Sequence, residues 1–392
     1  MATGDAYAPP AAPLLRDPRT RSIIFQVGLC VAVAVVAALL AWMAWSNLQR
    51  ANVASGFGFW NNLAGFDISQ TLIDYSSSTS TYGRAFWVGL INTLVVAALG
   101  IVLATIVGFV VGIARLSSNW LVAHLAAGYV QLVRNVPLLL QLLFWYNAVL
   151  KTLPGFRDSI ALWGGGYLNN RGLVLPAPDL NGNGQPILAA FVLGLIGAIV
   201  LVKLARRGRL GLGAAAGGSL ALVLGLPFAT FVATGATISF DYPEMSRFNL
   251  RGGMELQPEF VALVTGLVIY TGAFIAETVR AGLMAVARGQ TEAAQALGLS
   301  RTLTLRRVIV PQAMRVIIPP LTNQYLNLTK NSTLAVAIGY PDLVQIFTGT
   351  VLNQTGQAVE IVAITMAVYL VISLVTAFGM NLYNARMALA ER

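Results

Sequence analysis

The segment Thr291 to Pro311, TEAAQALGLSRTLTLRRVIVP, is the longest polar and basic stretch between two strongly apolar ones. A short helical pattern opens around Glu292 and stops at Gly298, because glycine adopts left-handed dihedral angles at little cost. Ser300 is placed to cap a second short helix that carries three arginines. The segment therefore predicts a helix, a glycine turn and another helix, on one side of a membrane.

The spacing of these residues resembles the EAA loop of binding-protein-dependent ABC importer permeases. The residues that carry the match are Glu292, Ala293, Ala294, Gly298, Val308, Val310 and Pro311. The wider run from Glu277 to Asn323 resembles the polar amino-acid branch of that family. In these permeases the loop is a coupling helix that docks into a cytoplasmic ATPase. The resemblance implies this role for Glu292, Ala293, Ala294, Gly298 and Pro311; Glu292 is expected to serve docking and to cap the positive end of its helix. The alternative is an ordinary amphipathic cytosolic loop.

Composition indicates an integral membrane protein. Only 10% of the 392 residues are charged and 57% are apolar, whereas soluble domains are about a quarter charged. The net charge of +10 comes from short basic clusters between apolar runs, which indicates membrane topology and lipid contact rather than nucleic-acid binding. One cysteine, Cys30, and one histidine, His124, make a disulfide, a metal site or a catalytic histidine relay improbable. None of the three lysines lies in a phosphate-binding glycine pattern.

Eight apolar stretches are long enough to be membrane spans of ~20 residues. They cover residues 23–45, 85–114, 135–150, 186–202, 211–233, 259–279, 312–337 and 359–383. Basic residues gather in the segments that this count places inside, including the cluster Lys203, Arg206, Arg207 and Arg209. The positive-inside rule then puts both termini in the cytoplasm.

The resemblance implies an all-α, type I ABC importer transmembrane domain with a five-helix core. We expect a disordered cytoplasmic tail at 1–21, an extra helix at 22–45, and core segments at 86–150 and 258–390, with the coupling loop at 281–311. Residues 151–257 form an insertion with two spans and periplasmic loops. This enlarged form is similar to the larger permease subunit of general L-amino-acid importers, which pairs with a second, related permease.

Polar residues within apolar spans are candidates for a substrate pathway, because they are costly in a bilayer. Gln141, Tyr146 and Asn147 follow Pro137 in a segment that resembles the second core helix. Asn323, Asn327 and Lys330 share one helix face, and Gln324 and Asn331 lie close to it. Interhelical hydrogen bonding is the alternative for this face.

Glu277 is the strongest ionisable candidate for a functional residue within a span, and it lies one helical turn before Arg280. It could line the pathway, but a local ion pair that closes the cytoplasmic end of the span is the favoured interpretation.

The function implied by the resemblance is ATP-driven uptake of L-amino acids across the bacterial inner membrane by alternating access. The expected partners are a cytoplasmic ABC ATPase dimer, a periplasmic amino-acid-binding protein and the second permease. ATP and magnesium would be bound by the ATPase, so this chain is expected to be no enzyme and to hold no cofactor or metal. A secondary transporter or a channel subunit for small polar solutes is the alternative, although neither broken inverted repeats nor a filter segment stands out.

Overall fold

The protein is described by a computed structural model that covers residues 18–50, 56–182, 184–206, 211–247 and 249–388. The first seventeen residues of the expected tail lie outside the described residues, as do Arg207 and Arg209 of the basic cluster. The α-helices are α1 Pro18–Arg50, α2 Tyr82–Ala114, α3 Trp120–Asn135, α4 Leu138–Leu143, α5 Gly184–Arg206, α6 Leu212–Leu220, α7 Leu226–Ala233, α8 Pro258–Met284, α9 Arg288–Ala296, α10 Arg301–Thr304, α11 Val310–Asn331, α12 Leu352–Thr355 and α13 Ala358–Ala388.

Six helical stretches within the described residues are long and apolar enough to cross a membrane. They lie in α1, α2, α5, the α6–α7 stretch, α8 and α13. A seventh is the pair α3 and α4, which is bent by 105° at the break between Asn135 and Leu138. The eighth stretch of the sequence analysis falls on α11. This helix has 22 residues but is not apolar enough to count among the candidate spans, because one of its faces is polar.

The centre of the bundle is the pair α2 and α8, which pack along much of their length. Glycines on α2 make this close approach possible. A β-carbon at Gly112 would lie 2.8 Å from the carbonyl oxygen of Ala276 and 2.8 Å from the Cβ of Val279. Small residues permit such contacts between helices in lipid, where tight packing replaces the hydrophobic effect as the driving force. Helix α11 packs on α8, and α13 packs on α11.

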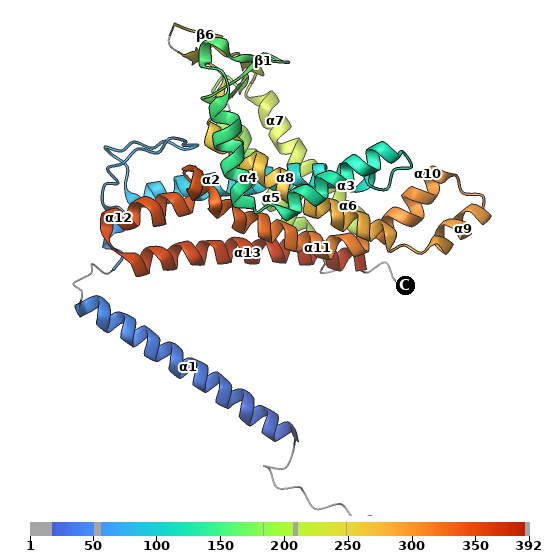
Figure 1. Cartoon of the computed structure of the whole chain (residues 1–392), viewed down its shortest axis with the longest axis horizontal. Helices are drawn as coiled ribbons and strands as arrows, with labels where there is room; N and C mark the ends of the chain where they lie inside the picture. The colour runs from blue at the N-terminus through green and yellow to red at the C-terminus, as the bar shows by residue number, and fades with distance from the viewer. Residues whose placement is uncertain (1–17, 51–55, 183, 207–210, 248, 389–392) are drawn as a thin grey trace, which may run out of the picture.

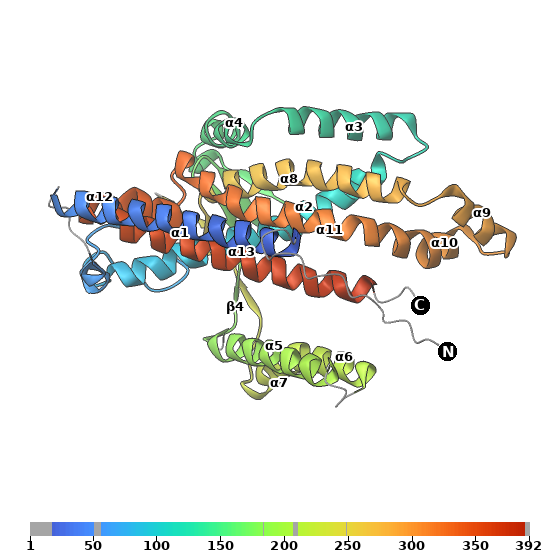
Figure 2. The ribbon, with the colours of Figure 1, turned by 90° about the horizontal axis from the view of Figure 1, so that it is seen from below.

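The bundle has two distinct ends, which Figure 1 separates along its horizontal axis. Helices α9 and α10 project from one end, and α12 lies at the other. Helix α13 runs from the α12 end back toward α9 and α10 (Figure 2), so its C-terminal end lies on the side of the expected coupling loop. This agrees with the expected cytoplasmic position of the C-terminus.

Short strands form between the helices of the region 151–257, which the all-α expectation did not include. They are β1 Ile160–Leu162, β2 Gly166–Asn169, β3 Gly172–Leu175, β4 Ala177–Asp179, β5 Ser239–Asp241, β6 Glu244–Met245, β7 Leu250–Arg251 and β8 Met254–Leu256. Strands β1, β2, β3 and β8 form one antiparallel sheet, and β4–β5 and β6–β7 form two antiparallel pairs. Strands of two to four residues leave too short an alternation of apolar and polar residues to be recognised in a sequence.

Two parts of the chain stand away from the bundle. Helix α1 is separate from it in Figure 1, and its spanning stretch is 0% buried. Helix α5 packs on α6 and α7, and this hairpin lies apart from the bundle in Figure 2. The domain boundaries stated above remain predictions, but α5 and the α6–α7 stretch do fall at the two spans expected within 151–257.

Candidate functional site

The turn after α9 is a Schellman motif, in which a left-handed residue ends the helix. Gly298 has φ +74°. The Leu299 N–H donates to the Ala294 carbonyl at 3.1 Å, and the Gly298 N–H donates to the Gln295 carbonyl at 2.9 Å. The next helix, α10, begins after Ser300, whose hydroxyl accepts from the Leu303 N–H. The predicted order of helix, glycine turn and helix is confirmed, and so is the predicted Ser300 cap.

The residues expected to couple transport to the ATPase lie on or next to α9, an exposed helix that projects beyond the bundle. Glu292 and Ala293 are exposed, whereas Ala294 is buried against the rest of the chain. Leu297, at the end of the same helix, is 81% exposed although it is apolar. An exposed leucine on the same helix as the exposed Glu292 and Ala293 forms a surface that a partner protein can cover.

One expectation for Glu292 is wrong. Helix α9 begins at Arg288, so Glu292 lies in its fifth position and cannot cap the N-terminus, and the first turn contains no acidic residue. The expected start near Glu292 came from the run Glu292-Ala293-Ala294, but the structure begins the helix four residues earlier and includes Gly289.

The backbone between the coupling turn and the membrane is irregular. Leu305–Ile309 forms a π-helical segment, η6, and α11 starts immediately after it with Pro311 in its first turn. Pro319 and Pro320 then lie inside α11, where each removes one intrahelical hydrogen bond. Helices bend at such positions. The π-helical segment η6 and the pair Pro319-Pro320 are therefore two places where the backbone between α9 and the polar face of α11 can bend.

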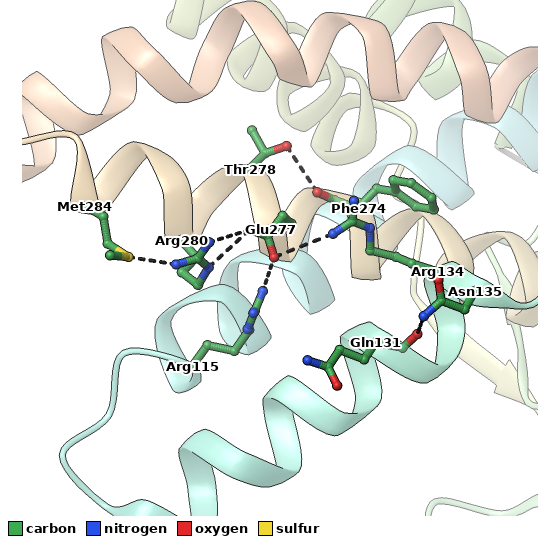
Figure 3. Close-up of polar contacts among 9 residues, drawn as sticks. All are labelled: Arg115, Gln131, Arg134, Asn135, Phe274, Glu277, Thr278, Arg280 and Met284. Carbon is green, nitrogen blue, oxygen red and sulfur yellow. Dashed lines mark hydrogen bonds and ion pairs between the residues drawn. The ribbon is translucent and has the colours of Figure 1, made fainter.

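Glu277 is held by three arginines from three different helical segments (Figure 3). Its Oε2 pairs with Arg115 and lies 3.6 Å from the Nη1 of Arg134. Its Oε1 accepts from Arg280, at 2.6 Å from Nη2 and 3.2 Å from Nε. We call these four residues the cytoplasmic cluster. The expected local pair of Glu277 and Arg280 is present, and Arg115 and Arg134 extend it to α2 and α3.

Helix ends bring the two distant arginines to this carboxylate. Arg115 is the C-cap residue of α2, and Arg134 lies in the last turn of α3. Positive side chains are stabilised there by the negative end of the helix dipole. Arg134 also lies over the Phe274 ring, 5.0 Å from its centroid. The cluster therefore ties the cytoplasmic ends of α2 and α3 to α8, and the single carboxylate is shared by three guanidinium groups, which leaves the cluster with an excess of positive charge.

Gln141, Tyr146 and Asn147 do not converge on one polar cavity. The Gln141 amide donates to the Val133 and Val136 carbonyls, both at 2.9 Å, and so stabilises the bend between α3 and α4. Tyr146 donates to Glu259 at 2.6 Å, and Asn147 is exposed and donates to its own helix. The cavity beside Gln141, of about 410 Å³, is otherwise lined by apolar side chains.

The polar residues of α11 are arranged as the spacing indicated. Asn323, Asn327 and Lys330 are all exposed on the same face, whereas Gln324 and Asn331 are half-buried beside it. Lys330 also lines an open cavity of about 380 Å³ between α11 and α13. Their side chains have no hydrogen-bond or ion-pair partner within the described residues. This face points away from the chain's own core, and its part in a substrate pathway remains a prediction.

Asp342 was not found by sequence reasoning. It is fully buried between the helical segments Ser332–Ile338 and Gln345–Val351, where it accepts from the Gln345 N–H at 2.8 Å and the Tyr369 hydroxyl at 3.2 Å. Nearby, the buried Asn92 donates to the Pro341 carbonyl, and Thr93 accepts from the Leu343 N–H. Asn92 and Thr93 therefore connect α2 to this buried segment by hydrogen bonds. The only sequence signal for Asp342 is a single carboxylate after Gly339-Tyr340-Pro341.

Comparison with known proteins connects this arrangement to a family. The family described as "Binding-protein-dependent transport system inner membrane component" matches residues 220–389, which include the coupling turn and the polar face of α11. "Putative amino-acid ABC transporter permease protein YhdX" of Escherichia coli (strain K12) is 49% identical over 388 residues, 96% of each chain. The chain belongs to this family of ABC transporter permeases.

Two further relatives match this permease over almost its whole length. "General L-amino acid transport system permease protein AapQ" of Rhizobium johnstonii is 48% identical over 382 residues, which are 96% of this chain and 94% of the relative. "Glutamate/glutamine/aspartate/asparagine transport system permease protein BztB" of Rhodobacter capsulatus is 40% identical over 415 residues, 97% and 96% of the two chains. Both matches include the insertion, so the permease shares its enlarged form with them.

Family membership settles the class and the location of the protein. It is a multi-pass inner-membrane permease of an ABC importer and works with an ATPase and a binding protein. The expected class of membrane protein, an ABC importer permease, and the permease function are confirmed at this level, and the alternatives of a secondary transporter and a channel are set aside.

Proposed function

We propose that this permease carries L-amino acids into the cytoplasm, as one half of a heterodimer with a second, related permease. The amino-acid class is supported by the names of three relatives that match the whole chain. ATP and magnesium are bound and used by the ATPase dimer, and the permease supplies the passage and its gates.

The observation that carries this proposal is the exposed polar face of α11. Two amides and an ammonium group, from Asn323, Asn327 and Lys330, would be costly if they faced lipid. Water or substrate can form hydrogen bonds with these groups if the face borders a water-filled passage shared with the second permease. A zwitterionic amino acid needs partners for a carboxylate and an ammonium group, and this face offers donors and acceptors for both.

The order of elements along the chain connects ATP hydrolysis to that face. The exposed helix α9 docks the ATPase, and α11 follows it through the π-helical segment and the proline pair. The cytoplasmic cluster holds α2, α3 and α8 together at the inner end of the passage. Alternating access then follows if movement of α9 shifts α11 against these helices, with the Glu277 ion pairs holding one of the two states.

Transport in proteoliposomes tests the proposal. The two permeases and the ATPase are reconstituted with the binding protein, and uptake of a panel of labelled L-amino acids is followed with and without ATP. We expect ATP-dependent accumulation, and a loss of about tenfold for Asn327→Leu, which removes the amide from the passage. Val316→Leu, an exchange at an exposed apolar position of the same helix, is the matched control. Uptake without ATP, or equal uptake by both variants, contradicts the proposal.

A cross-link tests the pairing separately. Asn327→Cys is introduced in a Cys30→Ser background, since Cys30 is the one native cysteine. Single cysteines are placed in turn along the corresponding helix of the second permease. Mild oxidation is expected to give a disulfide-linked heterodimer. Trp163→Cys, in the fully exposed outer turn, is expected to give none. Cross-linking to a second copy of this chain instead would show that the pairing is wrong.

A further inference from the structure

A cavity of about 450 Å³ lies between the coupling helix α9 and the segment α10–η6 that follows it. Its lining includes the apolar residues Leu283, Leu305 and Ile309, which we call the apolar wall. It also includes the two exposed arginines Arg288 and Arg301, which belong to the polar wall. The cavity therefore combines positive charge with hydrocarbon in its lining.

The polar wall contains groups that lack partners. Neither Arg288 nor Arg301 has an ion-pair or hydrogen-bond partner among the residues that the structure describes. Thr304, which lines the same cavity, is 3% exposed, and its hydroxyl oxygen is buried without a hydrogen-bond partner. A buried hydroxyl without a partner costs free energy. Two guanidinium groups and one orphan hydroxyl that line the same cavity are donors that suit an anion with several acceptor oxygens.

The position of the cavity limits what this anion can be. Leu283 and Val286 lie at the end of α8 and just after it, where the chain leaves the cytoplasmic side of the membrane. The anionic headgroups of the inner leaflet lie at this level, and basic pockets between helices on this side suit them. A free phosphate would occupy the arginine wall alone, whereas a phospholipid covers the apolar wall as well.

We propose that this cavity binds an anionic phospholipid of the cytoplasmic leaflet. Its phosphodiester lies against Arg288 and Arg301 and accepts from the Thr304 hydroxyl, and an acyl chain covers Leu305 and Ile309. The lipid fills the cavity between the coupling helix α9 and η6 and holds these two segments in place. The rate at which ATP hydrolysis is coupled to transport therefore depends on the headgroup charge of the surrounding lipid.

Lipid retention by the complete complex tests this assignment. The complex of both permeases and the ATPase is placed in nanodiscs of phosphatidylcholine alone or of an equal mixture with phosphatidylglycerol, and lipids that survive extraction are counted by native mass spectrometry. We expect phosphatidylglycerol to be retained by the wild type and about fivefold less by Arg301→Gln, the effect of one basic residue near an anionic headgroup. Arg306→Gln, an exposed arginine of the same segment outside the cavity, is the matched control.

Thr304→Val separates a lipid contact from a structural role. The substitution keeps the side-chain volume but removes the orphan hydroxyl. In phosphatidylcholine it is expected to leave the melting temperature unchanged or higher, while in the mixture it lowers phosphatidylglycerol retention. If the hydroxyl had only a structural role, the melting temperature and the retention of phosphatidylglycerol would change together.

Four results would overturn the proposal. The first is equal loss of lipid by Arg301→Gln and Arg306→Gln, which would indicate general attraction to the basic segment. The second is displacement of the lipid by millimolar inorganic phosphate, which would make the ligand a free anion. The third is retention only after the ATPase has been removed, which would assign the cavity to the ATPase interface. The fourth is no retention by the wild type.

Discussion

Arg115 at the end of α2 and Glu277 in α8 form an ion pair across 162 positions of sequence. The side chain of Arg115 is 13% exposed and that of Glu277 is 27% exposed, so the pair is partly shielded from water. Shielding strengthens the attraction and raises the cost of leaving either charge alone. The pair therefore fixes how the cytoplasmic ends of the two central helices meet.

Removal of the carboxylate should loosen this contact. Glu277→Gln leaves three arginines without a counter-charge, and we expect a destabilisation of ~2 kcal/mol, between the values for exposed and buried pairs. The melting temperature of the purified complex should fall accordingly. ATP-driven uptake should fall with it, because one of the two transport states loses its ion pairs.

A double-mutant cycle shows whether Arg115 acts through Glu277. Arg115→Met in the Glu277→Gln background should lower the melting temperature less than Arg115→Met alone, because the pair has already been broken. Independent effects of the two substitutions would mean that the pair carries no interaction energy. Glu244→Gln, at an exposed carboxylate in β6 far from both the cluster and the coupling helix, should leave the melting temperature unchanged.

Close packing of α2 on α8 leads to a second prediction. Gly112→Ala places a methyl group 2.8 Å from the Ala276 carbonyl oxygen, and we expect a loss of about 1–3 kcal/mol from overpacking. Gly128→Ala is the control, since no atom outside its helix lies within 4 Å of the new carbon. It should be neutral or stabilising by up to ~1 kcal/mol, from helix propensity. Thermal melting of both variants in one detergent compares them; equal melting temperatures would rule out this packing contact.

Asp342 provides a third prediction, because its carboxylate caps the helical segment that begins beyond it. Asp342→Asn keeps an oxygen that can accept from the Gln345 N–H, whereas Asp342→Leu leaves that donor unsatisfied at a cost of about 1–3 kcal/mol. We expect the leucine variant to melt well below the asparagine variant. If the two melt together, the hydrogen bonds of Asp342 do not stabilise the fold.

The sequence predicted those features that local patterns determine. Gly298 and Ser300 marked a helix end and a helix start, and α9 and α10 end and begin there. The apolar runs marked the spans, because bilayer thickness sets their length. The spacing of Asn323, Asn327 and Lys330 placed them on one face, and all three are exposed on it.

Features that depend on tertiary packing were not predictable in this way. No local pattern connects Arg115 and Arg134 with Glu277, because they are 162 and 143 positions away in the sequence. Gln141 was a candidate for the substrate pathway, and no local pattern indicated that its amide would donate to two backbone carbonyls at the bend between α3 and α4. Strand pairing of β3 with β8 joins residues on either side of the two-helix hairpin, beyond the reach of any sequence window.

The coupling turn gives the most direct test of the central claim, which is that α9 is the docking element of an ATP-driven permease. Gly298 has φ +74°, and apart from its two neighbours in the chain no atom of the described residues lies within 4 Å of the position where a β-carbon would be. A substitution there therefore acts through the backbone alone. Valine disfavours this conformation by about 1–2 kcal/mol, whereas asparagine adopts it more readily.

The measurement is the amount of ATPase and second permease that co-purify with the wild type, Gly298→Asn and Gly298→Val. The account predicts that both partners are retained by the wild type and the asparagine variant, and that the valine variant loses most of the ATPase but keeps the second permease. Full retention of the ATPase by the valine variant would contradict the coupling role of this turn. A chain that purifies alone and still moves amino acids without ATP would contradict the account as a whole.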